Sequence, residues 1–177
     1  MPDTPFIDRI VLSQIKDSGF TWRGNLSLGR FTRLQQEIHA DQPSDDLWVS
    51  VDLIAGVSGL FWLTLRVRGE LRLTCQRCLE GLIYPLSIDN RVAVLSSERL
   101  VELMDESDDY VLVAEIEAPD QTEAATVDLF QVIEDECLLA LPASPKHDDC
   151  AAAKTQAGDI DQIKPDNPFA QLSQLKK

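Results

Sequence analysis

The stretch Phe61-Trp-Leu-Thr-Leu-Arg-Val-Arg68 decides the fold class, because every second residue in it is apolar and the residues between them become polar. Side chains of a β-strand point alternately to the two faces of the sheet, so this period of two predicts a strand with one buried face. Similar runs extend the pattern over residues 47–95. These runs cover 71–74 and 82–86, and turn-forming breaks fall at 56–59, 69–70 and 89–90. The region therefore predicts an antiparallel β meander.

Two helices are expected to pack on this meander. The apolar residues Phe31, Leu34 and Ile38 recur at helical spacing, which predicts a short helix around them. A longer helix is expected after Asp128, whose carboxylate can cap it, and Gln131 three residues later can complete a capping box. Its apolar face consists of Phe130, Ile133, Cys137 and Leu141, and Pro142 ends it.

The remaining segments complete a single α+β domain, which we place at residues 1–150. Short strands are expected near the N-terminus, with Gly19 and Gly24 marking turns. An acidic linker at 102–109 leads to a further strand at 110–116. The fold class is therefore α+β, with an antiparallel meander, a few helices packed on it and a C-terminal tail.

Residues 151–177 are expected to form a flexible tail that ends in a short docking helix. The first part of this segment has no apolar period. Near its end, Asn167 can cap a helix that has Pro168 at its first position. Phe169 and Leu172 then fall on one face of that helix. Such a segment is suited to binding a partner.

The charge of the chain is strongly negative and unevenly distributed. The 177 residues carry a formal net charge of -14, of which -1 falls on residues 1–99 and -13 on residues 100–177. Affinity for nucleic acid depends on cations that replace counterions at the phosphates, so the second part should repel bare RNA or DNA. A basic protein is the partner that this charge favours, although an acidic surface also serves solubility.

A cytoplasmic protein without a membrane segment is expected. The most apolar stretch, 47–65, is interrupted by Ser50, Asp52 and Gly56, so it cannot form an uninterrupted membrane span. The first ten residues lack the basic and apolar regions of a signal peptide. Four cysteines in a reducing compartment then point to metal binding, redox chemistry or simple burial rather than to structural disulfides.

The pair Cys75 and Cys78 is a candidate metal site. It follows a β run, and a tight turn between strands can aim two thiolates at one tetrahedral ion, as in a zinc knuckle. The other close pair of ligand types is His147 and Cys150, so the predicted set is Cys75, Cys78, His147 and Cys150. Four protein ligands would make the zinc structural. A redox pair would need a helix after the first cysteine, and purely structural thiols are the other alternative.

The chain carries no motif that predicts catalysis. It contains no Gly-rich phosphate loop and only two histidines, His39 and His147. Cys137 lies on the apolar face of the second helix and is expected to be a core thiol. The acidic run from Glu134 to Glu136 could hold a cation or act as acid and base, but a solvated helix face is the favoured interpretation. We therefore expect a protein that is not an enzyme.

Three segments together resemble the YceD family of bacteria and plastids, the large ribosomal RNA subunit accumulation proteins. They are CQRCLE at 75–80, DLFQVIEDECLLALPASPKHDDC at 128–150 and NPFAQLSQLKK at 167–177. The resemblance implies a role in the accumulation of large-subunit ribosomal RNA without an assigned enzymatic activity. The positions that the family marks are Cys75, Cys78, Glu134, Asp135, Glu136, Pro142, Pro145, His147, Cys150, Asn167, Pro168 and Phe169.

The resulting hypothesis is a non-catalytic accessory factor that promotes accumulation of 23S ribosomal RNA by binding a basic ribosomal or assembly protein, or the pre-ribosomal large subunit. The expected partner-binding residues are Glu134, Asp135, Glu136, Asn167, Pro168, Phe169 and Leu172. The alternative is direct RNA binding through arginines on and beside the sheet, with a structural zinc. These arginines are Arg66, Arg68, Arg72 and Arg77. A thiol or metal enzyme is the third and least favoured class.

Overall fold

The computed structural model describes residues 5–15, 18–39, 46–113 and 126–153, which form two β-sheets and one α-helix. The larger sheet has the strand order β2-β3-β4-β5-β6, and β1 pairs with β7 in the smaller one. The strands are β1 (Arg9–Val11), β2 (Phe20–Leu26), β3 (Leu47–Ala55), β4 (Leu60–Thr74), β5 (Gly81–Leu95), β6 (Asp109–Leu112) and β7 (Thr126–Asp128), and the helix is α1 (Leu129–Leu139). Short 3-10 turns are η1 (Leu12–Gln14), η2 (Leu28–Arg30), η3 (Leu34–Glu37), η4 (Val57–Gly59) and η5 (Glu98–Leu103). The predicted α+β class is confirmed.

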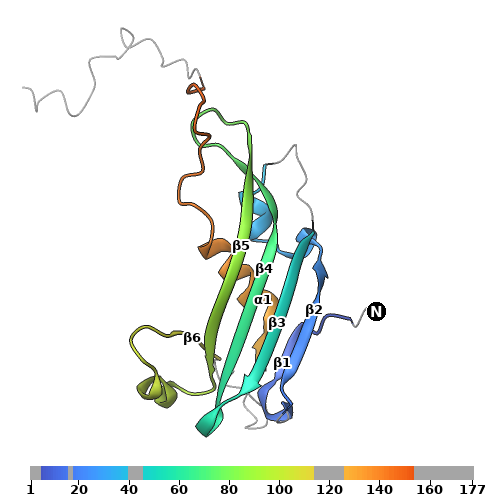
Figure 1. The fold of residues 1–177 in the computed structure, drawn as a ribbon, viewed down its shortest axis with the longest axis vertical. Coiled ribbons are helices and arrows are strands. Elements are labelled where there is room, and N and C mark those ends of the chain that lie inside the picture. Colours follow the sequence, from blue (N-terminus) through green and yellow to red (C-terminus); the bar gives the residue numbers. More distant parts are fainter. Residues whose placement is uncertain (1–4, 16–17, 40–45, 114–125, 154–177) are drawn as a thin grey trace, which may run out of the picture.

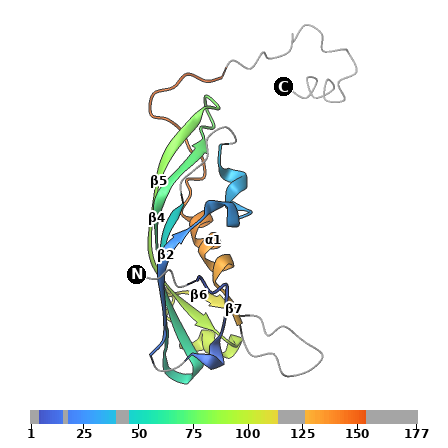
Figure 2. The same ribbon diagram turned by 90° about the vertical axis from the view of Figure 1, so that its right-hand side faces the viewer.

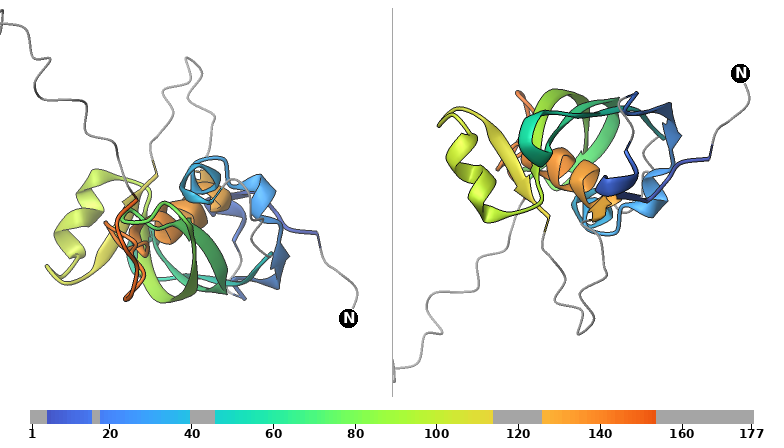
Figure 3. Two further views of the ribbon diagram at one scale, coloured as in Figure 1. Left: turned by 90° about the horizontal axis from the view of Figure 1, so that it is seen from above. Right: turned by 90° about the horizontal axis from the view of Figure 1, so that it is seen from below.

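The alternating pattern of β4 produces one buried face of the large sheet. Leu63, Leu65 and Val67 are fully buried, whereas the residues between them point to the opposite face. Val67 lies opposite Val49 of β3 and Ile88 of β5, so the apolar rows of three strands meet. Helix α1 covers this face, and the sheet curves around it (Figures 1 and 3). Within the described residues, the opposite face carries no helix (Figure 2).

Strands β4 and β5 are longer than predicted, because two of the expected breaks lie inside them. Gly69 and Glu70 continue β4, and a Cβ atom at Gly69 would lie 2.6 Å from a methyl carbon of Leu47. This glycine therefore permits a close approach to β3 and does not form a turn. Asp89 and Asn90 continue β5 in the same way. The predicted break at 56–59 is confirmed, since η4 separates β3 from β4 there.

The N-terminal strands and their turns differ from the prediction at one glycine. Gly19 has a φ of +69°, which fits a turn before β2. Gly24 lies within β2, where an added Cβ would come 2.7 Å from the Trp22 ring. The prediction of a turn at Gly24 is therefore wrong, and its missing side chain makes room for the indole.

The strand predicted at 110–116 pairs in an unexpected direction. β6 covers Asp109–Leu112 and runs parallel to β5, with Val92 opposite Asp109 and Leu95 opposite Leu112. The antiparallel meander predicted for residues 47–95 is formed by β3, β4 and β5, and β6 adds to it as a parallel edge strand. The connection through η5 packs Leu100 and Val101 against the end of the sheet and returns the chain in the direction of β5.

The short helix predicted around Phe31, Leu34 and Ile38 is replaced by 3-10 turns. Phe31 and Leu34 are buried, as their spacing predicted. Ile38, however, leaves η3 with extended backbone and forms an antiparallel bridge with Leu73 of β4. The next N–H, that of His39, donates to the carbonyl oxygen of Arg72 at 2.7 Å. Pairing with the sheet therefore ends the turn before an α-helix can form.

The predicted start of the second helix is confirmed. The Asp128 carboxylate accepts a hydrogen bond from the N–H of Gln131 at 3.0 Å, and α1 follows. Ile133 and Cys137 are buried as expected, whereas Phe130 is only half-buried. The helix ends at Leu139, and the chain reaches Pro142 in irregular structure.

Glu134 contradicts the expectation that the acidic run of α1 is a solvated face. It is only 7% exposed. Its carboxylate accepts hydrogen bonds from the N–H groups of Arg33 and Leu34 at 2.7 and 3.1 Å, and from the Arg33 guanidinium at 2.8 Å. Burial acts to raise its pKa, but these donors outweigh burial and hold it below the ordinary value of 4.5. One carboxylate thus fixes α1 to the turn at residues 33–34.

We expect Glu134→Gln to lower the free energy of unfolding at pH 7 by about 2 kcal/mol, because charge-assisted bonds to buried donors are lost. The folded-state pKa of Glu134 is lowered, so its contribution is complete above the ordinary carboxyl pKa and disappears as the pH falls through the lowered value. Urea denaturation between pH 3 and pH 7 measures this dependence.

Asp135→Asn is the matched control for this prediction. Asp135 also contacts the Arg33 guanidinium, at 2.6 Å, but its side chain is 44% exposed. Such surface ion pairs contribute less than about 1 kcal/mol. Equal losses in the two variants, or a Glu134→Gln effect independent of pH, would contradict the role assigned to Glu134.

Candidate metal centre

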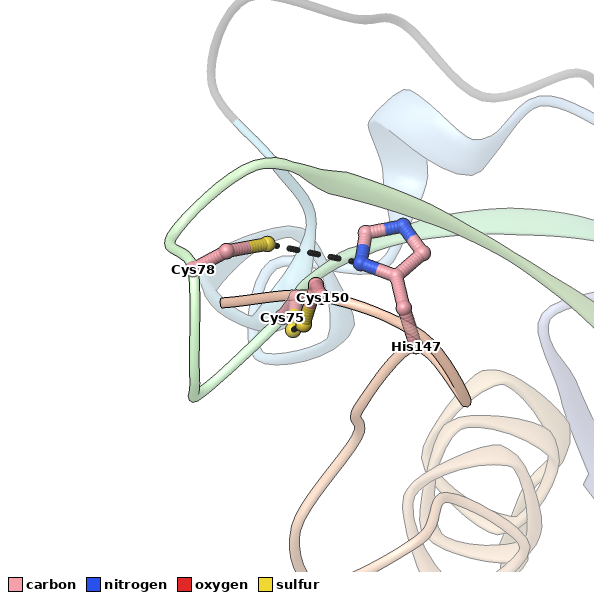
Figure 4. Close-up of side chains that lie close together, drawn as sticks. All are labelled: Cys75, Cys78, His147 and Cys150. Carbon is pink, nitrogen blue, oxygen red and sulfur yellow. Dashed lines mark hydrogen bonds between the residues drawn. The ribbon is translucent and has the colours of Figure 1, made fainter. Parts of the chain in front are cut away.

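The predicted knuckle forms the turn between β4 and β5. Cys75 directly follows β4, its N–H donates to the carbonyl of Glu80, and its own carbonyl accepts from the N–H of Leu79, both at 2.9 Å. Leu79 has a φ of 67°, in the left-handed region that non-glycine residues rarely adopt. These bonds tighten the turn so that the side chains of Cys75 and Cys78 point into the same space (Figure 4).

The segment after α1 brings the second pair of ligands to this turn. The N–H of Gln76 donates to the carbonyl of Pro145 at 2.8 Å, and the hydroxyl of Ser144 donates to the Gln76 side chain at the same distance. Further along, the N–H of Ala153 donates to the carbonyl of Arg77 at 2.9 Å. Residues 144–153 therefore lie along the knuckle and are hydrogen-bonded to it at both ends.

The four predicted ligands come together at this contact. The ligand atoms of Cys75, Cys78, His147 and Cys150 all lie within 4.8 Å of one another. The Sγ atoms of Cys75 and Cys150 are 3.7 Å apart, and Cys78 Sγ lies 3.4 Å from His147 Nδ1 (Figure 4). Ligands of a tetrahedral zinc, at bond lengths of about 2.0 to 2.3 Å, are separated by roughly 3.5 to 3.8 Å. The geometry and the donor set therefore suit a metal ion.

The surroundings of Cys75 stabilise its thiolate form. Burial acts to raise the pKa of this thiol, but backbone N–H groups of Cys78, His147 and Arg77 favour the anion and lower the pKa to about 5. Cys78 has its pKa raised: the N–H of Glu80 favours the anion, but burial and the neighbouring thiols of Cys75 and Cys150 oppose a second charge. A cation among these sulfur atoms would relieve that repulsion.

Arg77 connects the two halves of the cluster. Its Nε lies 3.0 Å from the Sγ of Cys150, and its Nη2 donates to the carbonyls of His147 and Asp148. Its pKa is raised, chiefly by Cys150. Three thiolates and a divalent ion leave one negative charge, which a guanidinium at this position balances. Arg77 also belongs to the predicted alternative RNA-binding set, and it lies in the cluster.

The other arginines of that set lie on or next to the uncovered face of the sheet. Arg66 faces Asp52 and Asp89 in ion pairs of 3.8 and 3.2 Å. Arg68 is exposed, and Arg72 is partly buried. β4 pairs with β5 without a bulge from Leu60 to Thr74, so these three side chains, which have the same strand parity, share a face.

The remaining candidates are distributed differently from the prediction. Cys137 is fully buried, and burial raises its pKa to about 12, which confirms a core thiol. Asp135 contacts Arg33, and Glu136 accepts a hydrogen bond from the Asn90 side chain at 2.8 Å. The tail residues Asn167, Pro168, Phe169 and Leu172 lie outside the described residues.

The sequence did not predict the contacts of two arginines, Arg77 and Arg33. Arg77 stands inside the Cys-x-x-Cys spacing, which is the only local signal that it belongs to the cluster. Arg33 lies about a hundred residues from Glu134, and nothing in either segment indicates that they meet.

The described part of the chain contains no helix that is both long and apolar enough to cross a membrane. Its fold and cluster define a small α+β protein in which a sheet turn and a C-terminal loop meet at a candidate metal centre.

The family described as large ribosomal RNA subunit accumulation protein YceD matches residues 63–176, well over half of the chain. The protein belongs to this family, and the predicted resemblance is confirmed. Comparisons with curated proteins and with solved structures gave no significant match.

Arg77→Ala should loosen the C-terminal loop without disrupting the sheet, because it removes the side-chain bonds to residues 147–150. Hydrogen exchange at the Gln76 and Ala153 amides, which bridge the two segments, is expected to accelerate by about tenfold or more. Arg68→Ala is the control, since this exposed side chain lies on the sheet. Unchanged exchange at both amides in Arg77→Ala would show that the guanidinium does not hold the loop.

Proposed function

We propose that this protein is a non-catalytic accessory factor of large-subunit ribosome biogenesis in the cytoplasm, and that it promotes accumulation of 23S ribosomal RNA by binding a protein or a pre-ribosomal particle. The observation that carries the proposal is the family match over residues 63–176. The family description refers to accumulation of ribosomal RNA and to no reaction.

Binding to a basic protein is supported by the charge of the chain. The formal net charge is -14, and Asp135 and Glu136 lie next to Leu139, which is 80% exposed at the end of α1. Carboxylates beside an exposed apolar side chain suit a partner that carries both basic and apolar residues. We keep the segment with Asn167, Pro168, Phe169 and Leu172 as a second proposed contact.

Direct RNA binding is the less favoured alternative. Arg66 is already paired with two carboxylates, and Arg77 donates to the C-terminal loop. Binding phosphate at Arg66 would therefore require those ion pairs to be replaced. Arg66 is therefore better explained as a partner of neighbouring acidic residues than as an RNA contact.

We also propose that the cluster of Cys75, Cys78, His147 and Cys150 binds a structural zinc ion. Zinc prefers thiolate and imidazole ligands in tetrahedral sets, and four protein ligands leave no open position for a substrate. The ion would hold residues 147–150 on the turn between β4 and β5. Its role is therefore to stabilise the fold around the knuckle.

The zinc proposal predicts about one zinc ion per chain in protein purified under reducing conditions, measured by elemental analysis. The double variant Cys75→Ser, Cys150→Ser should lose the ion and unfold at a lower temperature, because metal binding stabilises the folded state. Cys137→Ala should keep the ion, since this thiol lies in the core. Zinc-free wild-type protein, or undiminished zinc in the double variant, would contradict the assignment.

The biogenesis proposal predicts that cells lacking the protein show less 23S ribosomal RNA and fewer large subunits relative to small ones in sucrose gradients. The full-length chain should restore both quantities. A chain without residues 160–177 tests the proposed C-terminal contact in the same strain. A deletion strain with normal gradients and normal 23S levels would show that the proposal is wrong.

A further inference from the structure

We infer that the open edge of β5 and the acidic groove beside it bind an extended basic polypeptide segment, which adds to the sheet as a further strand. This inference rests on the proposed function for its biological use, because it assigns a site to the basic partner. The binding itself follows from the geometry of β5, β6 and α1 and can be measured on the isolated protein.

The edge of β5 is only partly covered. β6 pairs with β5 over Val92–Leu95 and meets only one end of this fifteen-residue strand (Figure 1). In the part of the chain that the structure describes, no strand pairs with the same edge over residues 82–91. A strand in line with β6 would therefore continue the sheet beside these residues.

The direction of the backbone groups along this edge follows from one hydrogen bond. The carbonyl of Leu95 accepts from the N–H of Val113 at 2.8 Å, so the backbone of Leu95 faces the β6 side. Successive residues of a strand direct their N–H and C=O groups to opposite sides. The backbone N–H and C=O groups of Ser87, Asp89 and Arg91 therefore point to the open edge. Those of the residues between them point to β4.

Two residues agree with this assignment. Pro85 lies two residues before Ser87, so its backbone points to the same open edge. Proline has no N–H, and a strand tolerates it where the missing donor would face an open edge. The N–H of Arg91 donates to the side-chain oxygen of Asn90 at 2.8 Å and so is satisfied without a neighbouring strand. Ser87 and Asp89 remain between these two positions as the docking points for an added strand.

The groove beside the edge is acidic and contains exposed apolar groups. It has a volume of about 520 Å³ and lies between β5, the start of β6 and the last turns of α1. Four carboxylates line it, and no lysine or arginine does. Its exposed apolar side chains are Tyr110 and Leu139, at 49% and 80% exposure. The four carboxylates belong to Asp89, Asp109, Asp135 and Glu136.

These features select the chemistry of the occupant. An extended peptide offers backbone donors and acceptors at the spacing of the open edge, and its alternate side chains reach the groove. Asp89 and Asp135 already pair with Arg66 and Arg33, so a lysine or arginine of the peptide would pair first with Asp109 and Glu136. An apolar residue would contact Leu139 or Tyr110. A nucleic acid would be repelled by the same carboxylates. A second copy of this chain is disfavoured because each copy carries a net charge of -14.

The test uses the full-length protein and a fluorescent peptide with four Lys-Val repeats, and the corresponding Glu-Val peptide is the control. Fluorescence anisotropy should show binding of the Lys-Val peptide only. Hydrogen exchange at the amides of Ser87 and Asp89 should slow by at least tenfold in the complex, because an added strand protects them. Equal binding of both peptides, or unchanged exchange at these amides, would overturn the inference.

Ser87→Pro removes one edge donor while leaving the bonds between β4 and β5 intact, and Ser87→Ala is its control. We expect at least a tenfold loss of affinity in the first variant and none in the second. If Ser87→Pro fails to fold, the substitutions Asp109→Asn and Leu139→Ser at exposed positions test the groove. Each is expected to lower the affinity for the Lys-Val peptide. Wild-type affinity for the Lys-Val peptide in all folded groove variants would refute the site. A wild-type dimer that Ser87→Pro converts to monomer would also refute it, because the edge would then bind a second copy of this chain.

Complementation separates the inference from the proposed function. If Ser87→Pro protein restores 23S ribosomal RNA as well as the wild type does, the groove is not the functional contact and the biogenesis role stands. If cells lacking the protein show no ribosomal defect, the biogenesis role fails whatever the peptide measurements show. A folded Ser87→Pro protein that fails to restore 23S levels supports both.

Discussion

Pairing between β4 and β5 is the interaction on which the rest of the molecule depends. The two strands remain in register from Leu60 opposite Leu95 to Thr74 opposite Gly81. The length of these paired strands has two consequences. It provides the apolar face that α1 covers, and it carries the Cys75–Cys78 turn to the end of the sheet. The metal-binding candidate and the hydrophobic core are therefore separate parts of one hairpin.

Two polar residues close this arrangement, one on α1 and one in the turn of the hairpin. Glu134 binds two backbone donors and a guanidinium from the turn at 33–34, which fixes α1 over the sheet. Arg77 binds the loop that follows α1. The segment from α1 to Cys150 is therefore fixed near each of its ends, once through Glu134 and once through Arg77.

Local patterns predicted the strands, the helix start and the four clustered ligands, and they failed where distant residues decide the outcome. The alternation of apolar and polar residues at 61–68 predicts burial correctly, because one face of the strand packs in the core and the other does not. The local sequence predicts a turn at Gly69, because the contact with Leu47 that requires a glycine comes from another strand. The same limit explains Glu134, whose acidic neighbours suggested solvent while its true environment is set by Arg33. Likewise, the parallel direction of β6 depends on the path of the whole connection through η5.

The division of the cluster between two distant segments has a consequence for the order of folding. Cys75 and Cys150 stand 75 positions apart in the chain, and Cys78 and His147 stand 69 apart. During synthesis the knuckle is complete long before His147 and Cys150 leave the ribosome. Until then, an ion could bind only two of its four ligands from this chain. Tetrahedral binding thus becomes possible only after α1 and every other element of the described core have been synthesised.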